Sequence, residues 1–193
     1  THIGAGRTQA TEDITSRVLY RSTQRQLNGF AFRSAILRNA MATVKRSLVP
    51  LGEEIDIVEA YLELERMRYE ERLRVQIDVP PELEREQVPP MILQPLVENA
   101  VRHGIAPLLK GGDLHISAQR TTNGLALIVR NTGHYEPGKV RGSGIGLRNT
   151  RRRLEIIYGG KAHLTITNTN GAVESRVEIP YGDLQHAPEL RPK

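Results

Sequence analysis

Cysteine and tryptophan are absent from this chain of 193 residues, and it contains only two phenylalanines and six tyrosines. Without cysteine the chain forms no disulfide bond and no thiolate-ligated zinc site. The shortage of aromatic side chains argues against the stacking surfaces that bind single-stranded nucleic acids. No apolar run approaches the ~18 residues of a membrane span, and no secretion signal opens the chain. These absences predict a soluble cytoplasmic domain that makes no membrane contact.

The positive charge of the chain is concentrated at its beginning. The net charge is +5, yet residues 1–50 hold 8 Lys and Arg against 2 Asp and Glu, whereas residues 51–193 hold 19 against 20. The larger part of the chain is therefore not basic. Because nucleic-acid binding depends on a basic surface, we expect no nucleic-acid partner.

Apolar periodicity predicts three helical regions. Residues 1–25 show a weak pattern and are interpreted as a linker or an expression remnant. Residues 26–71 are predicted to form a helical segment, a partial dimerisation and connector region interrupted at Pro50, whose second part is a long amphipathic helix from Leu51 onward. A second helix is predicted from Pro90 to Gly104, with proline at its start and glycine at its end. A third is predicted at 146–158, where Gly159 and Gly160 follow.

Strand signals alternate with these helices. Residues 73–79 alternate apolar and polar side chains, as in a half-buried strand. Two hairpins are predicted where alternating segments flank Asn123-Gly124 and Asn170-Gly171. The pattern predicts an α/β (α+β) two-layer sandwich with helices on one face of a mixed, mostly antiparallel sheet. We expect this domain at 72–181, followed by a disordered tail at 182–193.

The helix predicted at 90–104 has two chemically different faces. Its polar residues fall within an arc of about 140°, and its apolar residues fill the opposite side. The polar residues are Glu98, Asn99, Arg102 and His103. One interpretation is a solvated face with a Glu98–Arg102 ion pair. The other is a site for a hard metal ion that carries phosphates, since Mg²⁺ takes few protein oxygens.

Two further segments have the composition of ligand-binding loops. Three alternating glycines precede the third predicted helix, where backbone N–H groups can approach a phosphate. This glycine segment is Arg141, Gly142, Ser143, Gly144, Ile145, Gly146 and Leu147. A flexible loop is the alternative, and a Rossmann arrangement is disfavoured because no strand directly precedes the glycines. Asn131 and Gly133 end a predicted strand, where a base can be recognised or where the chain simply turns.

Taken in order, these segments resemble the catalytic domain of the LytS/YehU-type sensor histidine kinases, within the gyrase, chaperone, kinase and MutL ATPase superfamily. PPMILQPLVENAVRHGI is similar to the family's N box, NTGHYEPG stands at its G1 box, and GSGIGLRNTRRRLEIIYGG is similar to its G2 box. The segment LVPLGEEIDIVEAYLELERMRYEERL is similar to the family's connector. The resemblance covers about residues 48–181.

The resemblance implies a cytoplasmic ATP-binding domain of a two-component system, with Mg²⁺ as cofactor, a response regulator as partner and dimerisation through helices of a longer, membrane-anchored protein. It implies that Asn99 ligates Mg²⁺, that Glu98 polarises the nucleophile and that Arg102 and His103 contact phosphates. Asn131 and Gly133 would accommodate adenine under a loop at 134–143. The glycine segment, residues 141–147, would hold the phosphates.

Two positions depart from the family pattern. Asn131 stands where the superfamily commonly has aspartate, and an amide oxygen is a weaker acceptor than a carboxylate. The family's acceptor motif is Q-I-N-P-H-F-L-F-N, whereas Gln26–Arg33 contains no histidine. The sequence therefore leaves three functions open. They are histidine phosphorylation on an acceptor outside this stretch, a regulatory module that binds ATP without transferring phosphate, and a serine kinase of the anti-sigma type.

Overall fold

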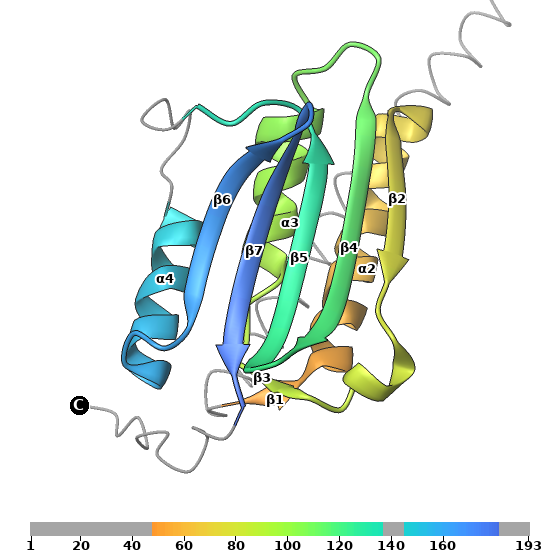
Figure 1. The fold of residues 1–193 in the computed structure, drawn as a ribbon. Coiled ribbons are helices and arrows are strands. Elements are labelled where there is room, and N and C mark those ends of the chain that lie inside the picture. Colours follow the sequence, from red (N-terminus) through yellow and green to blue (C-terminus); the bar gives the residue numbers. More distant parts are fainter. Residues whose placement is uncertain (1–47, 137–144, 182–193) are drawn as a thin grey trace, which may run out of the picture. The chain divides into compact units, whose positions relative to one another are not determined.

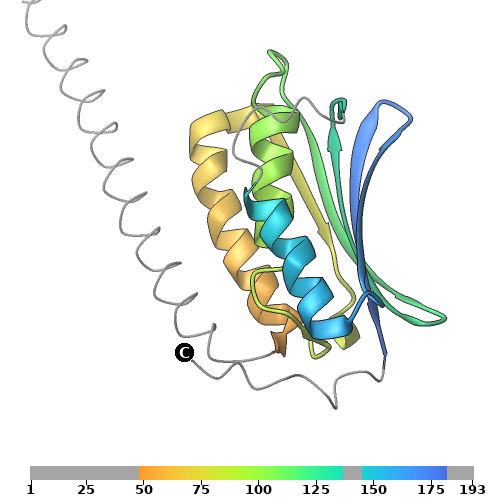
Figure 2. The same ribbon diagram turned by 90° about the vertical axis from the view of Figure 1, so that its left-hand side faces the viewer.

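The fold has two layers, a sheet and a set of helices. The computed structural model describes residues 48–136 and 145–181, which lie within one compact unit, Ala42–Lys193. Three helices cover one face of a five-stranded sheet, and no described helix covers the other face (Figures 1 and 2). The predicted architecture is confirmed. The helix predicted before Pro50 and the tail at 182–193 lie outside the described residues.

The first helix, α2 (Leu51–Tyr69), confirms the long amphipathic helix. Its acidic first turn, Glu53 and Glu54, suits the positive end of the helix dipole. The helix ends because Glu70 takes a positive φ of 52°, and a 3₁₀ turn, η1 (Glu70–Arg72), leads into the sheet. Its buried residues are Leu51, Glu54, Ile55, Val58 and Leu62.

The sheet has the strand order β2-β4-β5-β7-β6. Only the pair β2–β4 is parallel, because a long connection that contains a helix joins the two strands; the other pairs are antiparallel. The strands are β2 (Leu73–Asp78), β4 (Gly112–Thr121), β5 (Gly124–Thr132), β6 (His163–Thr169) and β7 (Ala172–Pro180). A small two-stranded sheet, β1 (Val49–Pro50) with β3 (Gln87–Val88), was not predicted, because two-residue strands show no periodicity.

The two Asn-Gly hairpins turn differently. Asn170 and Gly171 form the two-residue turn of β6–β7, with φ angles of 49° and 76°, as predicted. In β4–β5 the prediction was wrong by one residue, because Gly124 pairs with Thr121 and the turn is Thr122-Asn123. Gly124 serves another purpose there: a Cβ would overlap the carbonyl oxygen of Ile179 on the adjacent strand.

The second predicted helix begins later than expected. Helix α3 (Gln94–Asn99) starts four residues after Pro90, after a 3₁₀ turn η2 (Pro81–Leu83) and strand β3. Met91 has a φ of 59°, which a right-handed helix cannot include. Wider π-helical turns, η3 (Ala100–Ile105), continue α3. The third helix, α4 (Ile145–Tyr158), ends as predicted at Gly159 and Gly160, both with positive φ.

The core lies between the sheet and the helices. It takes apolar side chains from α2, α3, η3, α4 and the inner faces of the strands. Among the described residues, no helix combines the length and apolar character that crossing a membrane requires. Glu98, Asn99, Arg102 and His103 therefore belong to a helix whose opposite face is packed in this core.

Candidate functional site

The polar arc predicted on the second helix is present along α3 and η3. All six apolar residues predicted to face the core are buried; they are Ile92, Leu93, Leu96, Val97, Ala100 and Val101. Glu98 and Asn99 are half-buried, whereas Arg102 and His103 are exposed. The helix therefore directs an amide oxygen, a carboxylate, a cation and an imidazole away from the sheet.

The change from α-helical to π-helical turns occurs within this arc. The N–H of Ala100 donates to the carbonyl oxygens of Leu96 and Val97, as at the end of an α-helix. The N–H of Ala106 donates to the carbonyl oxygen of Val101, five residues back, at 2.8 Å, as in a π-helix. Such wide turns are rare and frequently mark functional sites. Sequence periodicity did not predict them, because they alter the spacing of side chains by less than the pattern resolves.

Gly104 brings η3 against the end of β5. A Cβ at Gly104 would overlap the side-chain nitrogen of Asn131 and lie 3.2 Å from the carbonyl oxygen of Thr132. The sequence had suggested that Gly104 ends the helix. The structure shows that glycine is required there because the helix and β5 approach closely. The approach places Asn131 and Gly133 beside the helix that carries Asn99.

Asn131 is 4 % exposed, and its Nδ2 donates to the Thr132 carbonyl at 2.9 Å. Gly133 has a φ of 139° and donates its N–H to Gly171 at 3.4 Å. A Cβ at Gly133 would lie 3.3 Å from the carbonyl oxygen of Gly104. These two predicted site residues and η3 therefore meet in the structure.

Glu98 has a partner that sequence reasoning missed. Gln94, only 5 % exposed, donates from Nε2 to Glu98 Oε1 at 2.8 Å. The Oε1 of Gln94 is buried and has no hydrogen-bond partner among the described residues. The four-residue spacing between Gln94 and Glu98 was the available signal in the sequence.

Tyr61 on α2 lies near Glu98. Burial and the nearby charges of Glu65 and Glu98 raise the pKa of Tyr61, which remains a neutral phenol.

The His103 imidazole has a lowered pKa, which favours its neutral form. Partial burial, followed by the positive charge of Arg102, lowers its pKa below the usual value. At neutral pH, His103 therefore supplies one N–H donor, and Arg102 supplies the positive charge.

Asn168 on β6 was also missed by the sequence analysis. Its Oδ1 accepts from the Tyr135 N–H and its Nδ2 donates to the Tyr135 carbonyl, both at 2.8 Å. This side chain thus replaces strand pairing for Tyr135, two residues beyond Gly133. Nothing in the local pattern distinguished Asn168 from other exposed strand residues.

The start of α4 lies beside α3. A Cβ at Gly146 would be 3.5 Å from the Pro95 Cβ, and the Gly146 carbonyl accepts from Thr150 Oγ1 at 3.1 Å. Leu147 packs partly buried against the core. Arg141, Gly142, Ser143 and Gly144 lie outside the described residues, as does the Ile145 side chain, so their predicted contacts with phosphate remain predictions.

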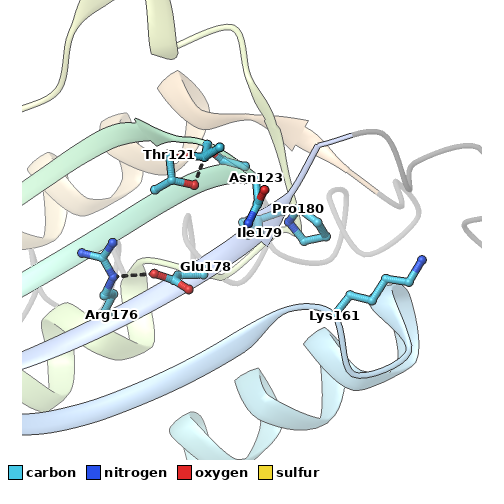
Figure 3. Close-up of a pocket in the computed structure, with 9 residues that line it drawn as sticks. Thr121, Asn123, Lys161, Arg176, Glu178, Ile179 and Pro180 are labelled. Carbon is cyan, nitrogen blue, oxygen red and sulfur yellow. Dashed lines mark hydrogen bonds and ion pairs between the residues drawn. The ribbon is translucent and has the colours of Figure 1, made fainter.

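A surface pocket lies away from the predicted site residues (Figure 3). It has a volume of about 350 Å³ and is lined by the β4–β5 turn, at the opposite end of β5 from Asn131. Its walls include the Arg176–Glu178 ion pair, 2.8 Å long, and Lys161. None of the predicted site residues lines it, so it carries no part of the site.

The donor set of α3 and η3 fits Mg²⁺ bound together with a triphosphate. In residues 48–136 and 145–181, no three His, Cys, Asp or Glu side chains converge as metal ligands. A Mg²⁺ ion bound with phosphates keeps most of its ligands as phosphate oxygens and water. A single amide oxygen at Asn99, with Arg102 and His103 three and four residues further along, is a chemically suitable complement.

Comparison with known proteins identifies sensor kinases. The sequence profile of the family described as histidine kinase matches residues 20–73. Sensor histidine kinase BtsS of Escherichia coli strain K12 is 42 % identical over 137 residues, which is 70 % of this chain and 24 % of BtsS. Sensor protein LytS of Oceanobacillus iheyensis is 30 % identical over 162 residues, 77 % of this chain and 28 % of LytS. The chain spans about a quarter of the length of these relatives.

Solved histidine kinases share the fold. The catalytic domain of histidine kinase ThkA superposes with a TM-score of 0.55 at 19 % identity, over 69 % of this chain and 95 % of that domain. The structure of ThkA in complex with a response regulator protein gives a TM-score of 0.53 at 16 % identity, over 94 % and 65 % of the two chains. At these identities the likeness concerns the fold alone.

Proposed function

Because the chain belongs to the LytS/BtsS-type sensor histidine kinases, we propose that it binds Mg-ATP and transfers the γ-phosphoryl group to a histidine, for relay to a response regulator. The observation that supports this most is the meeting of three separate segments. Gly104 abuts Asn131, and Gly146 faces Pro95 at ordinary contact distance. The helix bearing Asn99 therefore lies between the end of β5 and the start of α4.

Each polar residue of the helix has one proposed role. Asn99 offers its amide oxygen to Mg²⁺, which supplies charge neutralisation for the phosphates when bound. Arg102 offers a guanidinium, and His103 offers an imidazole N–H, to phosphate oxygens. The N-terminus of α4 offers backbone N–H groups and its dipole to the same anion.

The adenine would lie at the end of β5. The side-chain oxygen of Asn131 would accept a hydrogen bond from the adenine amino group. Gly133, which has no side chain, would leave room for the base beside Asn131. The roles of Arg141, Gly142, Ser143 and Gly144 at the phosphates rest on the family resemblance.

Phosphoryl transfer forms a bond from an imidazole nitrogen to phosphorus and breaks the bond from phosphorus to the leaving oxygen of the nucleotide. Glu98, held by Gln94 through Oε1, has its second carboxylate oxygen available to accept the other N–H of that imidazole. This acceptance orients the nucleophile and stabilises the positive charge that develops on it. Positioning and charge neutralisation supply the remaining catalysis.

A regulatory module that binds ATP without transfer is the second candidate, because Gln26–Arg33 contains no histidine. The two are separated by incubating the chain with γ-labelled Mg-ATP and a family acceptor helix that contains its histidine. Acid-labile label on the helix supports the kinase. Tight binding with no label on the helix contradicts transfer and supports the module.

A further inference from the structure

A buried carboxylate on α2 is bonded to the turn that starts α3. Glu54 is 1 % exposed. Its Oε1 accepts from the N–H of Met91 at 2.7 Å, and its Oε2 accepts from Ile92 at 2.9 Å and Leu93 at 3.1 Å. Three consecutive N–H groups thus converge on one side chain of another helix, immediately before Gln94.

The same turn is bonded to α4. Arg153, which is half-buried, donates from Nη1 to the carbonyl oxygen of Pro90. The pKa of Glu54 is raised, because the effect of burial exceeds the opposing effects of the three N–H groups and the charge of Arg153. Burial also lowers the pKa of Arg153, which the charge of Glu54 opposes. The Glu54 network, defined as Glu54, residues 90–93 and Arg153, therefore joins α2, α3 and α4.

The Glu54 network lies close enough to Asn99 that a small displacement of its residues would move the candidate site. Asn99 follows Leu93 by six residues, about 9 Å along a helix. The helix between them is short and packed, so a displacement of residues 91–93 is carried to Asn99. On the other side, Arg153 lies two turns beyond Gly146 on α4, and rigid packing transmits the displacement in the same way.

We propose that Glu54 and Arg153 are positioning residues of the nucleotide site. They set the spacing between Asn99 on α3 and the N-terminus of α4, and they make nucleotide affinity depend on the placement of α2. The inference rests on the proposed function and adds its regulation. A purely apolar contact would stabilise the fold without fixing this spacing, because it is not directional.

The test compares buried and exposed positions on the same helices. Glu54→Gln replaces the carboxyl group of the network by an amide, and Arg153→Lys keeps the positive charge at 153 but changes the hydrogen bond to Pro90. Glu59→Gln on α2 and Arg152→Lys on α4 are the matched controls, since both residues are exposed. Titration calorimetry with Mg-AMP-PNP, well below the lowest melting temperature, gives the dissociation constant of each folded protein.

We expect each network variant to raise the dissociation constant by roughly 5-fold or more, the lower range of allosteric coupling, with both controls unchanged. Without nucleotide, hydrogen exchange at amides 91–99 should be faster in Glu54→Gln than in Glu59→Gln. Folded network variants with the wild-type dissociation constant overturn the inference, because a merely structural role lowers the melting temperature alone. If Glu54→Gln does not fold, Arg153→Lys decides.

Wild-type binding and the variant ratio answer separate questions. If the wild-type chain does not bind Mg-AMP-PNP, the proposed function fails, and the inference fails with it. If the wild type binds and the variants bind equally well, only the inference fails.

Discussion

Helices α3 and α4 lie side by side on the sheet, yet they obey different rules. Helix α4 (Ile145–Tyr158) ends where its own sequence predicts, with Gly159 and Gly160 after its last turn. Helix α3 begins after a left-handed Met91 held by Glu54 and passes into π-helical turns at Ala100. Local signals suffice for α4, whereas contacts distant in sequence define α3. The helix that departs from local rules is the one that carries the candidate site, as expected where function competes with regular structure.

The largest effect should come from the glycine that contacts β5. Gly104→Ala places a Cβ into the Asn131 side chain, and we expect a loss of about 3 kcal/mol in the free energy of unfolding, as for overpacking in a rigid core. Urea denaturation measures this loss. Gly146→Ala is the control on α4, where the added Cβ would lie at ordinary distance from Pro95 and stability should change by less than about 1 kcal/mol. Equal losses in both variants would contradict the distinction between the helices.

A smaller effect is expected at Tyr135. Asn168→Ala removes two hydrogen bonds to its backbone, and we expect a loss of about 2 kcal/mol. Thr167→Ala, at the neighbouring exposed position of β6, should cost less than about 1 kcal/mol. A loss at Asn168 no greater than that at Thr167 would show that the two bonds are not formed in solution.

Gln94→Leu tests the support of Glu98 with little effect on stability. The buried amide oxygen of Gln94 has no partner in the described chain, so an apolar side chain of similar size should change stability by less than about 1 kcal/mol. Because the carboxylate loses its donor, the Glu98 side chain should become more mobile. Carbon NMR relaxation of the Glu98 carboxyl group measures this motion, and unchanged relaxation would exclude the positioning role of Gln94.

The smallest effect concerns His103. Its folded-state pKa is lowered, so the unfolded chain binds the proton more tightly and stability falls as pH drops through about 6.5, the unfolded value. The side chain is exposed, so the contribution should be below about 0.5 kcal/mol. Urea denaturation at pH 7.5 and 5.5 should show a smaller pH dependence in His103→Gln than in the wild type. Thr165→Ala, an exposed control on β6 whose side chain does not ionise, should retain the wild-type dependence.

The sequence predicted the layers, the five strands of the main sheet and the polar arc of Glu98, Asn99, Arg102 and His103, because these depend on periodicity. It misplaced the start of α3, since the bonds from Glu54 cross about 37 residues of chain and leave no local pattern. It shifted one hairpin turn by a residue, because Gly124 is required by Ile179 on another strand. Gln94 and Asn168 were missed for the same reason: their roles arise from partners that the local sequence does not identify.

The central claim is that Asn99 and the residues around it bind Mg-ATP. Titration calorimetry of the wild-type chain and of Asn99→Ala, each with and without Mg²⁺, tests it most directly. We predict Mg²⁺-dependent binding to the wild type and a dissociation constant raised by about 100-fold in Asn99→Ala, which corresponds to about 2.7 kcal/mol. Equal affinity of the two proteins, or no binding of Mg-ATP to the wild type, would contradict the account.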